Sequence, residues 1–295
     1  MVCVKLTPDQ EEQEGPMQTQ QPHPADLHTD PDCLIAFLHI PKTAGTTLNS
    51  ILSREYAPDE CYEIMMRGMA WIPPRPTLIR RPLISISKVL RLRAAVRSPR
   101  KLRLVRGHFD LSIARHLPDD TRFFTLLRDP VERAISHYYH YRRRAIERLH
   151  PLAMRSTLKE WVSGCGIVEM DNGQTRRLAG EMNLPCGRVT PAMLERAISR
   201  LARFAAVGLT ERFDESLLLL QRAFGWRARP APAQNVGENR PPRIDVSEEA
   251  LQVIERSNRF DRELYRFASQ LFEARVSGIN AGKARLVEER VALAG

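Results

Sequence analysis

The sequence predicts an α/β fold, in which helices flank a central parallel sheet and the C-terminal half is largely helical. Two apolar runs of strand length, residues 34–40 (LIAFLHI) and 122–127 (RFFTLL), each pass through a short loop into a helix-compatible stretch. Continuous apolar runs are typical of strands buried on both faces of a parallel sheet. Because the two units are joined by a long crossover, we expect their strands to run in the same direction.

The first unit begins with the strand at residues 34–40, which stops at Pro41. A helix is expected from Thr46 to about residue 56, and Thr46 or Thr47 is placed to cap it because a hydroxyl oxygen accepts from the first free N–H groups of a helix. The loop between strand and helix is short and contains a lysine and a glycine.

The second unit follows a short strand expected at residues 102–106, which ends just before a Gly-His pair. After the strand at residues 122–127, Asp129 stands at a cap position and Pro130 at the first helical position. These residues are a strong signal for a helix start, and we expect the helix to continue to about residue 149.

The C-terminal half reads as mostly helical, with one more buried strand at residues 204–209 (FAAVGL) and a polar, Pro-rich loop at residues 227–242. Thr190 and Pro191 form a second cap-and-proline signal. Apolar residues recur with helical spacing in five segments. These segments are residues 155–163, 171–180, 191–203, 211–224 and 247 to about 274.

The composition bounds the class of protein. The chain has 295 residues, 43% of them hydrophobic and 27% charged, which excludes a wholly disordered or fibrous protein. We expect residues 1–31 to be a disordered acidic segment, residues 32–275 to form one domain, and residues 276–295 to be a tail. No apolar run approaches the ~18–20 residues of a membrane span, and a signal peptide is not evident, so a cytoplasmic location is expected.

The net charge of +10 is concentrated in one stretch, residues 67–106, which holds twelve Lys and Arg residues and no Asp or Glu. Concentrated charge favours contact with a polyanion, an acidic glycan or an anionic membrane, and the inner membrane face is then a site of peripheral contact. Residues 83–97 are compatible with a basic amphipathic helix. The alternative is a solvated linker. We expect no nucleic-acid partner.

The cysteines predict neither a disulfide framework nor a zinc site. Their number is odd, no CxxC pair occurs, and whether Cys165 meets Cys186 stays open. The five are Cys3, Cys33, Cys61, Cys165 and Cys186.

The loop after the first strand has the composition of an anion site. A helix N-terminus offers unpaired N–H groups and a partial positive charge, and Lys42 adds a full charge beside them. The loop is P-loop-like without being a Walker A motif, because Lys42 precedes Gly45 instead of following it. The alternative is an ordinary strand–helix loop with a surface lysine. The residues assigned to the site are Lys42, Thr43, Ala44, Gly45, Thr46 and Thr47.

The second strand–helix junction carries another cationic group. Arg128 follows the strand at residues 122–127, and Ser136 lies two turns into the next helix. Ligands of open α/β sheets bind at the carboxyl ends of the strands. Two such ends, each with an anion-binding group, indicate one ligand with two separated anionic groups. The alternative for Arg128 is a salt bridge to Asp129 or Glu132.

These motifs resemble those of sulfotransferases. Residues 39–47 (HIPKTAGTT) are similar to the family's 5′-phosphosulfate loop, and residues 127–136 (LRDPVERAIS) to its 3′-phosphate motif. The closer similarity is to the carbohydrate branch that includes heparan sulfate 2-O- and 6-O-sulfotransferases and bacterial relatives. Four more stretches fit that branch, within a resemblance that spans roughly residues 34–272. They are residues 106–109 (RGHF), 171–180 (DNGQTRRLAG), 207–217 (VGLTERFDESL) and 258–265 (NRFDRELY).

The resemblance departs in two places. Animal members carry an N-terminal membrane anchor, which we do not expect here, and the basic stretch at residues 67–106 matches no element of the family. The resemblance implies that 3′-phosphoadenosine 5′-phosphosulfate is the donor and that its sulfuryl group moves by in-line displacement to a hydroxyl of a carbohydrate, in a glycan or glycolipid. No metal is expected, because a sulfuryl group carries less charge than a terminal phosphate.

A general base must take the proton of the acceptor, and an imidazole titrates in the right range. His108 follows a short strand and matches the position of the family's catalytic histidine, so we predict that it is the base. Its pKa should be lowered by Lys42 and Arg106. His39 is expected to be a positioning residue. Two further histidines, His137 and His140, are expected to pack or to contact the acceptor.

Other assignments rest on the resemblance more loosely. Asn235 and Asn239 lie in the polar loop, where a late loop covers the nucleotide in the family, and Asn235 is assigned to the donor site. The role of Gln174 is not predicted, and Arg176 is expected to reach a sugar carboxylate or the nucleotide, or to form a salt bridge on the helix surface.

Two other functions compete with sulfuryl transfer. A nucleotide kinase would need a Walker A motif and a magnesium carboxylate, which are not found. A non-catalytic protein that binds polyanions or membranes would keep the nucleotide fold but lose part of the site. The simultaneous presence of Lys42, His108, Arg128 and Ser136 favours the enzyme.

Overall fold

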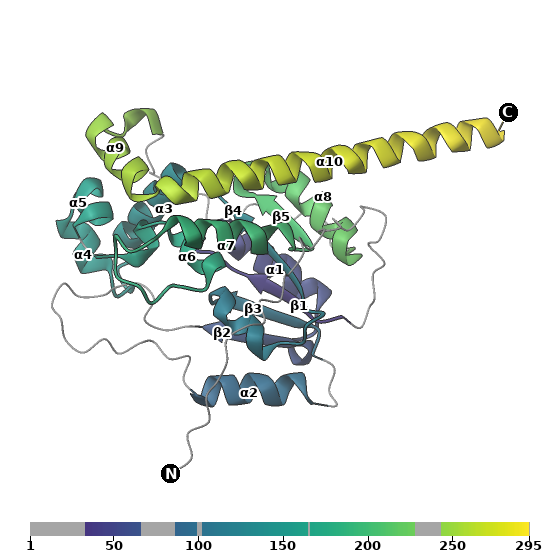
Figure 1. Cartoon of the computed structure of the whole chain (residues 1–295), viewed down its shortest axis with the longest axis horizontal. Coiled ribbons are helices and arrows are strands. Elements are labelled where there is room, and N and C mark those ends of the chain that lie inside the picture. The colour runs from purple at the N-terminus through teal and green to yellow at the C-terminus, as the bar shows by residue number, and fades with distance from the viewer. Residues whose placement is uncertain (1–32, 66–85, 99–101, 165, 228–242, 295) are drawn as a thin grey trace, which may run out of the picture.

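Five parallel strands form the centre of the computed structural model, which describes residues 33–65, 86–98, 102–164, 166–227 and 243–294 (Figure 1). The strand order is β2-β3-β1-β4-β5, so the predicted parallel sheet is confirmed. The strands are β1 (Ile35–Leu38), β2 (Cys61–Met65), β3 (Leu104–His108), β4 (Arg122–Leu127) and β5 (Ala206–Leu209).

The register aligns the carboxyl ends of the central strands. Leu38, the last residue of β1, lies opposite Gly107 of β3 and Thr125 of β4. The Thr125 hydroxyl donates to the Leu38 carbonyl at 2.7 Å, which adds a side-chain link between β4 and β1. The residues that follow these strands therefore meet at one edge of the sheet.

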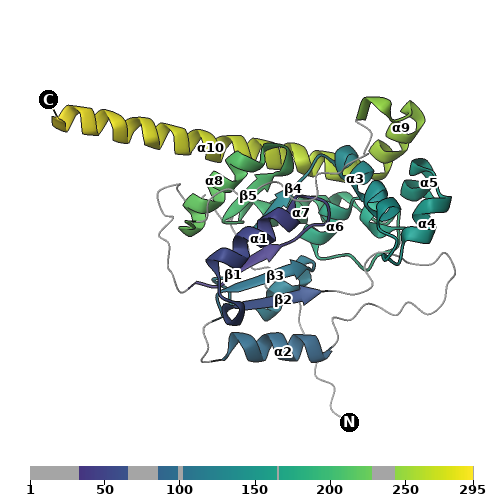
Figure 2. The ribbon, with the colours of Figure 1, turned by 180° about the vertical axis from the view of Figure 1, so that it is seen from behind.

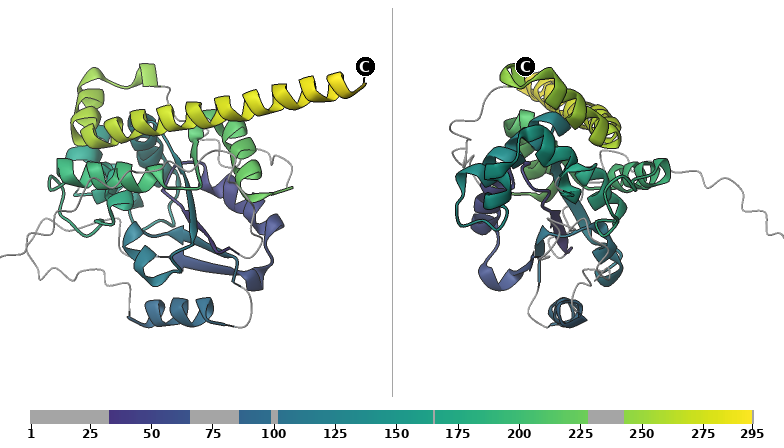
Figure 3. Two further views of the ribbon diagram at one scale, coloured as in Figure 1. Left: turned by 45° about the vertical axis from the view of Figure 1, so that its right-hand side comes forward. Right: turned by 90° about the vertical axis from the view of Figure 1, so that its left-hand side faces the viewer.

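Helices cover both faces of the sheet. Helix α1 (Gly45–Glu55) lies on one face, and α6 (Gly173–Ala179) and α7 (Pro191–Ala202) lie on the other (Figures 1 and 2). The last helix runs past β5 and continues beyond the sheet (Figure 3). The other helices are α2 (Ile86–Val96), α3 (Pro130–Arg143), α4 (His150–Arg155), α5 (Leu158–Ser163), α8 (Phe213–Phe224), α9 (Glu248–Ser257) and α10 (Arg259–Ala294).

Two cap assignments are confirmed and one is wrong. The Asp129 carboxylate accepts from the N–H groups of Val131 and Glu132 at 3.0 Å, and Thr190 caps α7. Helix α1 starts one residue earlier than predicted, and the residue before it, Ala44, has no capping side chain. Neither Thr46 nor Thr47 is its cap, because both lie inside the helix.

Two predicted helices are interrupted. Helix α3 stops at Arg143, where the His150 imidazole donates to the Tyr141 carbonyl at 2.8 Å and so satisfies one of the last carbonyls of the helix. The helix expected from residue 247 to about 274 breaks at Asn258, whose amide donates to the carbonyls of Ile254 and Met170. Helix α10 then continues through the predicted tail to Ala294.

At the edge of the sheet formed by β2 and β3, the observed strands differ from the predicted ones. Strand β2 was not predicted, because its sequence (CYEIM) is short and contains a charged residue. Among the described strands it pairs with β3 alone. Strand β3 extends to His108, so this histidine is a strand residue and does not lie in a loop. Gly107 takes a φ of 138°, and a β-carbon there would lie 2.0 Å from the Ile64 carbonyl oxygen.

The basic stretch contains the helix α2, so the predicted helix at residues 83–97 is confirmed over part of its length. Leu92 is buried, whereas Leu90, Arg91 and Arg93 are exposed. The part of the chain that the structure describes contains no helix with the length and apolarity of a membrane span. Contact of this stretch with a polyanion or membrane stays a prediction.

A buried cluster of charges joins the sheet to the C-terminal helices. Glu169 lies between two arginines: its carboxylate is 3.3 Å from Arg133 and forms an ion pair with Arg177, which also donates to the Phe109 carbonyl at 2.9 Å. The Arg133 and Glu169 side chains are 1% and 3% exposed. Arg133 also lies 3.6 Å from Asp261 at the start of α10.

Helices α6 and α10 cap each other. The Asn172 side chain, just before α6, accepts from the N–H groups of Phe260 and Asp261 in the first turn of α10 (2.8 and 3.2 Å). The Asp261 carboxylate accepts from the N–H groups of Gln174 and Thr175 in the first turn of α6 (3.1 and 2.7 Å). Two helix N-termini that would repel each other are thereby both satisfied.

We expect Glu169→Gln to lower the free energy of unfolding by about 3–5 kcal/mol, because it leaves the buried Arg177 without its carboxylate and leaves Arg133 with Asp261 alone. Urea denaturation measures the change. The matched control is Glu181→Gln, which removes a partly exposed pair with Arg196 at 3.3 Å and should cost at most about 1 kcal/mol. Equal effects of the two substitutions would show that the buried cluster does not stabilise the fold.

Candidate active site

The loop between β1 and α1 has a backbone suited to an anion. Lys42 and Ala44 both take positive φ angles, 71° and 60°, which non-glycine residues adopt only when the surroundings hold them. The Thr43 hydroxyl donates to the Ile40 carbonyl at 2.9 Å and stabilises this turn. Because α1 has neither a capping side chain nor an acidic residue in its first turn, its N–H groups suit an anionic ligand.

Gly45 is required by the ring of His39. A β-carbon on Gly45 would lie 1.9 Å from His39 Nε2, so any other residue would collide with the imidazole. The His39 ring is buried and stacks on the ring of Phe37. The sequence assigned Gly45 to the anion site; the structure shows that this glycine also makes room for a histidine behind the loop.

His108 lies against His39 at the same edge of the sheet, and their ring centroids are 4.1 Å apart. The Nδ1 atom of His108 is 2.9 Å from the His39 carbonyl oxygen. A carbonyl only accepts hydrogen bonds, so Nδ1 carries the proton in this contact, and Nε2 of the neutral ring has a lone pair available for a substrate proton.

The pKa of His108 is lowered mainly by burial and next by the positive charge of Arg177, while the contact with the His39 carbonyl opposes the shift. The predicted direction is confirmed, but the predicted causes are wrong. Arg106 lies toward α1, where its guanidinium donates to the Ser53 hydroxyl at 3.0 Å. Lys42 instead lowers the pKa of His39 and of His140.

Arg128 links the end of β4 to the loop after β1. Its guanidinium donates to the Lys42 carbonyl at 3.1 Å, so the two motifs that are far apart in the sequence meet. Glu132 and Glu211 lie 3.9 and 3.8 Å away, and burial lowers the pKa of Arg128. Its buried Nε makes no hydrogen bond to the described part of the chain and is the atom that lies closest to Glu211.

Ser136 lies half-buried on α3, two turns beyond Arg128. Among the loop residues assigned to the site, Thr46 is exposed, whereas Thr43 and Thr47 are buried. Of these, Thr46 is the hydroxyl that faces solvent and is open to a ligand, since Thr43 already bonds to Ile40.

The sequence profile of the sulfotransferase family matches residues 25–184, more than half of the chain. The chain belongs to the sulfotransferase family. The predicted family is therefore confirmed. The family's two nucleotide motifs were assigned from the sequence to residues 39–47 and 127–136, which form the loop after β1 and the strand end at Arg128.

Curated relatives come from the carbohydrate branch of the family. Heparan-sulfate 6-O-sulfotransferase 1 of Homo sapiens is 30% identical over 278 residues, which cover 83% of this chain and 66% of the human protein. Heparan-sulfate 6-O-sulfotransferase 2 of Gallus gallus is 27% identical over 289 residues, covering 84% of this chain and 68% of the chicken protein. This sulfotransferase chain thus spans about two thirds of the length of these relatives.

A solved structure also matches, that of mouse sulfotransferase SULT7A1 complexed with PAP. The identity is 16% and the TM-score 0.35, over 79% of this chain and 65% of the mouse chain. The fold of this sulfotransferase chain is defined by its own strand order and register.

Two residues of the 171–180 motif are structural in this sulfotransferase chain. Arg176 is fully buried, where it pairs with Asp171 and donates to the carbonyls of Leu184 and Pro185 (2.7 and 2.8 Å). The salt bridge expected of Arg176 is thus present, but it is buried and does not lie on the helix surface as expected. A contact of Arg176 with a sugar carboxylate or the nucleotide stays a prediction. Gln174, whose role was not predicted, contacts the backbone of Arg128.

Of the two histidines on α3, His137 is a packing residue. It is buried and accepts from the Trp161 indole N–H at 3.2 Å. His140 is partly buried, and its burial together with Lys42, Arg144 and Arg143 lowers its pKa to about 4. The contribution of Lys42 indicates that His140 lies near the loop, and a contact with the acceptor stays a prediction.

Several assignments lie outside the described residues. These are Asn235, Asn239, Cys165 and the acidic segment at residues 1–31. Cys186 is exposed. No cluster of metal-ligating side chains occurs within the described ranges, and the absence of a metal stays a prediction.

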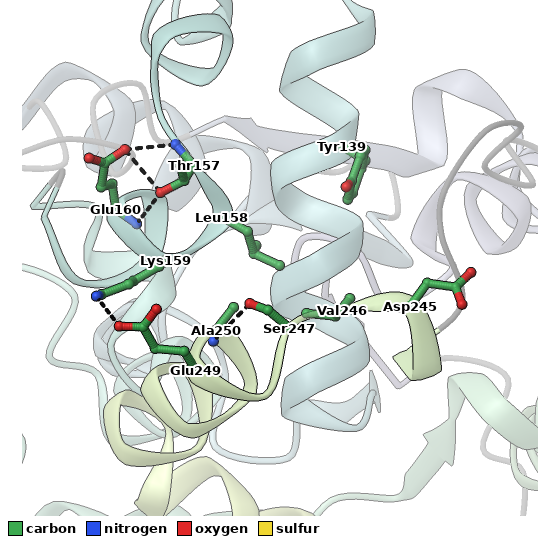
Figure 4. Close-up of a pocket in the computed structure, with 10 residues that line it drawn as sticks. All are labelled: Tyr139, Thr157, Leu158, Lys159, Glu160, Asp245, Val246, Ser247, Glu249 and Ala250. Atoms are coloured by element: carbon green, nitrogen blue, oxygen red, sulfur yellow. Dashed lines mark hydrogen bonds and ion pairs between the residues drawn. The ribbon is translucent and has the colours of Figure 1, made fainter.

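A hollow of about 460 Å³ lies between α3, α5 and α9 (Figure 4). Two pairs of its polar residues bond to each other, Lys159 with Glu249 and Thr157 with Glu160. Its lining residues include none from the loop after β1 or from β3, so the hollow is separate from the candidate site.

We expect Gly45→Ala to lower both the melting temperature and the affinity for a nucleotide bisphosphate, because the new methyl group displaces His39 or the loop. Adding His39→Ala should restore much of the melting temperature, since it removes the colliding ring. Differential scanning fluorimetry with and without adenosine 3′,5′-bisphosphate measures both. The control is Gly278→Ala on α10, where a β-carbon meets open space and stability should hold or rise. Normal nucleotide affinity of Gly45→Ala would contradict the packing argument.

Proposed function

We propose that this chain transfers the sulfuryl group of 3′-phosphoadenosine 5′-phosphosulfate to a hydroxyl of a carbohydrate, in a glycan or glycolipid. The observation that supports the proposal most is the 3.1 Å hydrogen bond from Arg128 to the Lys42 carbonyl, because it brings together two strand ends that suit anions. A nucleotide with anionic groups at its 3′ and 5′ positions matches this pair of sites. The carbohydrate acceptor is inferred from the names of the curated relatives.

Lys42 and the first N–H groups of α1 are assigned to the leaving group. When the bond between sulfur and the 5′-phosphate oxygen breaks, negative charge develops on that oxygen, and a fixed cation with helix N–H groups stabilises it. Arg128 and Ser136 are assigned to the 3′-phosphate, which is remote from the reacting sulfur. Arg128 therefore contributes to binding more than to the chemical step.

His108 is assigned as the general base. Its Nε2 accepts the proton of the acceptor hydroxyl as the hydroxyl oxygen forms its bond to sulfur. The Nδ1 contact to the His39 carbonyl keeps the ring in the tautomer that this step needs. Since burial lowers the pKa of His108, the ring is in its neutral, proton-accepting form at neutral pH.

The donor assignment predicts that adenosine 3′,5′-bisphosphate stabilises the protein and that ATP with magnesium does not. A ligand at 100 times its dissociation constant adds about 2.7 kcal/mol to the free energy of unfolding, which a thermal shift detects. Arg128→Ala should lose most of this shift, and Arg155→Ala, an exposed arginine on α4, should keep it. A shift with ATP alone would favour a kinase-like protein instead.

The base assignment predicts that His108→Ala lowers single-turnover sulfuryl transfer to a glycan by about 10²–10⁴-fold, while bisphosphate affinity is unchanged. The wild-type rate should be constant near neutral pH and fall in acid, because protonation of His108 removes the base; its midpoint should lie below the ordinary pKa of 6.5. The donor is radiolabelled and tested against a panel of glycans.

The control for this prediction is His116→Ala, a histidine that contacts Arg93 and Arg115 at the surface and should leave the rate unchanged. If His108→Ala keeps more than about a tenth of the wild-type rate, the loss is below the range for a general base and another group fills this role. His140 would then be the next residue to test.

A further inference from the structure

Gln174 continues the sheet where the strand pairing of β4 ends. Its side-chain oxygen accepts from the Arg128 backbone N–H at 3.0 Å, and its side-chain nitrogen donates to the Arg128 carbonyl at 2.9 Å. An amide that bonds to both backbone groups of one residue reproduces what a neighbouring strand would supply. Gln174 is fully buried, so water does not compete for these bonds.

The register of β4 explains why such a partner is needed. Pairing with β1 ends at Thr125, and pairing with β5 ends at Leu127. The next backbone groups are bonded by side chains: Thr210 donates to the Leu127 carbonyl at 3.0 Å, and Glu211 accepts from the Asp129 N–H at 3.1 Å. Between them, Arg128 depends on Gln174 for both of its backbone hydrogen bonds.

Gln174 is itself held firmly. Its backbone N–H donates to the Asp261 carboxylate at 3.1 Å, within the mutual capping of α6 and α10. Asp261 is also bonded by the N–H and the hydroxyl of Thr175 (2.7 and 2.8 Å). The amide of Gln174 therefore has a fixed position from which it holds Arg128.

The Arg128 guanidinium needs this restraint because carboxylates compete for it. Glu132 and Glu211 lie 3.9 and 3.8 Å away, whereas the bond to the Lys42 carbonyl turns the guanidinium toward the loop. Without the clamp, the backbone of Arg128 loses two hydrogen bonds, and its side chain is free to move toward the carboxylates.

We propose that Gln174 is a positioning residue that fixes Arg128 for the 3′-phosphate, and that it thereby sets the preference of the site for 3′-phosphorylated adenine nucleotides. This inference rests on the proposed function. Gln174 should affect the 3′ end of the nucleotide and not the 5′ end. Within the described part of the chain, the hydrogen bonds of Gln174 outside its own helix are to Arg128 and Asp261, and none of them is to the loop after β1.

The test measures dissociation constants for adenosine 3′,5′-bisphosphate and for adenosine 5′-monophosphate by calorimetry. For Gln174→Ala we expect the affinity for the bisphosphate to fall about tenfold or more, which corresponds to the loss of one to two hydrogen bonds between Arg128 and the 3′-phosphate. The affinity for the monophosphate should change less than about twofold. A general folding defect would weaken both nucleotides alike. The matched control is Gln252→Ala, an exposed glutamine on α9, which should change neither.

A second comparison tests whether Gln174 acts through Arg128. In the Arg128→Ala background, Gln174→Ala should weaken bisphosphate binding no further, because the group that it positions is already absent. An additive loss, or a Gln174→Ala variant that keeps the wild-type preference for the bisphosphate, overturns the inference alone. A wild-type protein that binds both nucleotides equally overturns the proposed function and the inference with it.

Discussion

The mutual capping of α6 and α10 is the contact on which the arrangement of the C-terminal half depends. Two helix N-termini face each other, and each is satisfied by a side chain from the other: Asn172 serves α10 and Asp261 serves α6. Burial raises the pKa of the Asp261 carboxyl, and Arg133 together with the N–H groups of α6 opposes that rise. The sequence motifs at residues 171–180 and 258–265 are thus two halves of one structural unit.

The strands and helix starts could be predicted because their signals are local. The strand at Arg122–Leu127 was predicted to the residue, and Asp129 and Thr190 cap the helices assigned to them. The break at Asn258 could not be predicted, because its amide bonds to Met170, 88 residues away. The same holds for β2, which in the described part of the chain pairs with β3 alone.

The meeting of the assigned residues at one edge of the sheet was predictable, whereas their contacts were less so. Lys42, Arg128 and His108 lie at aligned strand ends, as the parallel sheet requires. The collision between a Gly45 side chain and His39 depends on a ring packed behind the loop, and the lowered pKa of His108 depends first on burial and then on Arg177 from α6. Neither contact could be predicted from the spacing of residues along the chain.

The clamp on Arg128 also has a consequence for the order of events during synthesis. Arg128 is held by a residue 46 positions later, which in turn is held by Asp261, another 87 positions on. Closing such long segments carries an entropic cost that must be met before the contacts form. A nascent chain that has released the sheet strands β1 to β4 from the ribosome therefore still lacks the side chains that hold Arg128. We expect nucleotide-binding competence to arise late, when α10 has emerged and docked.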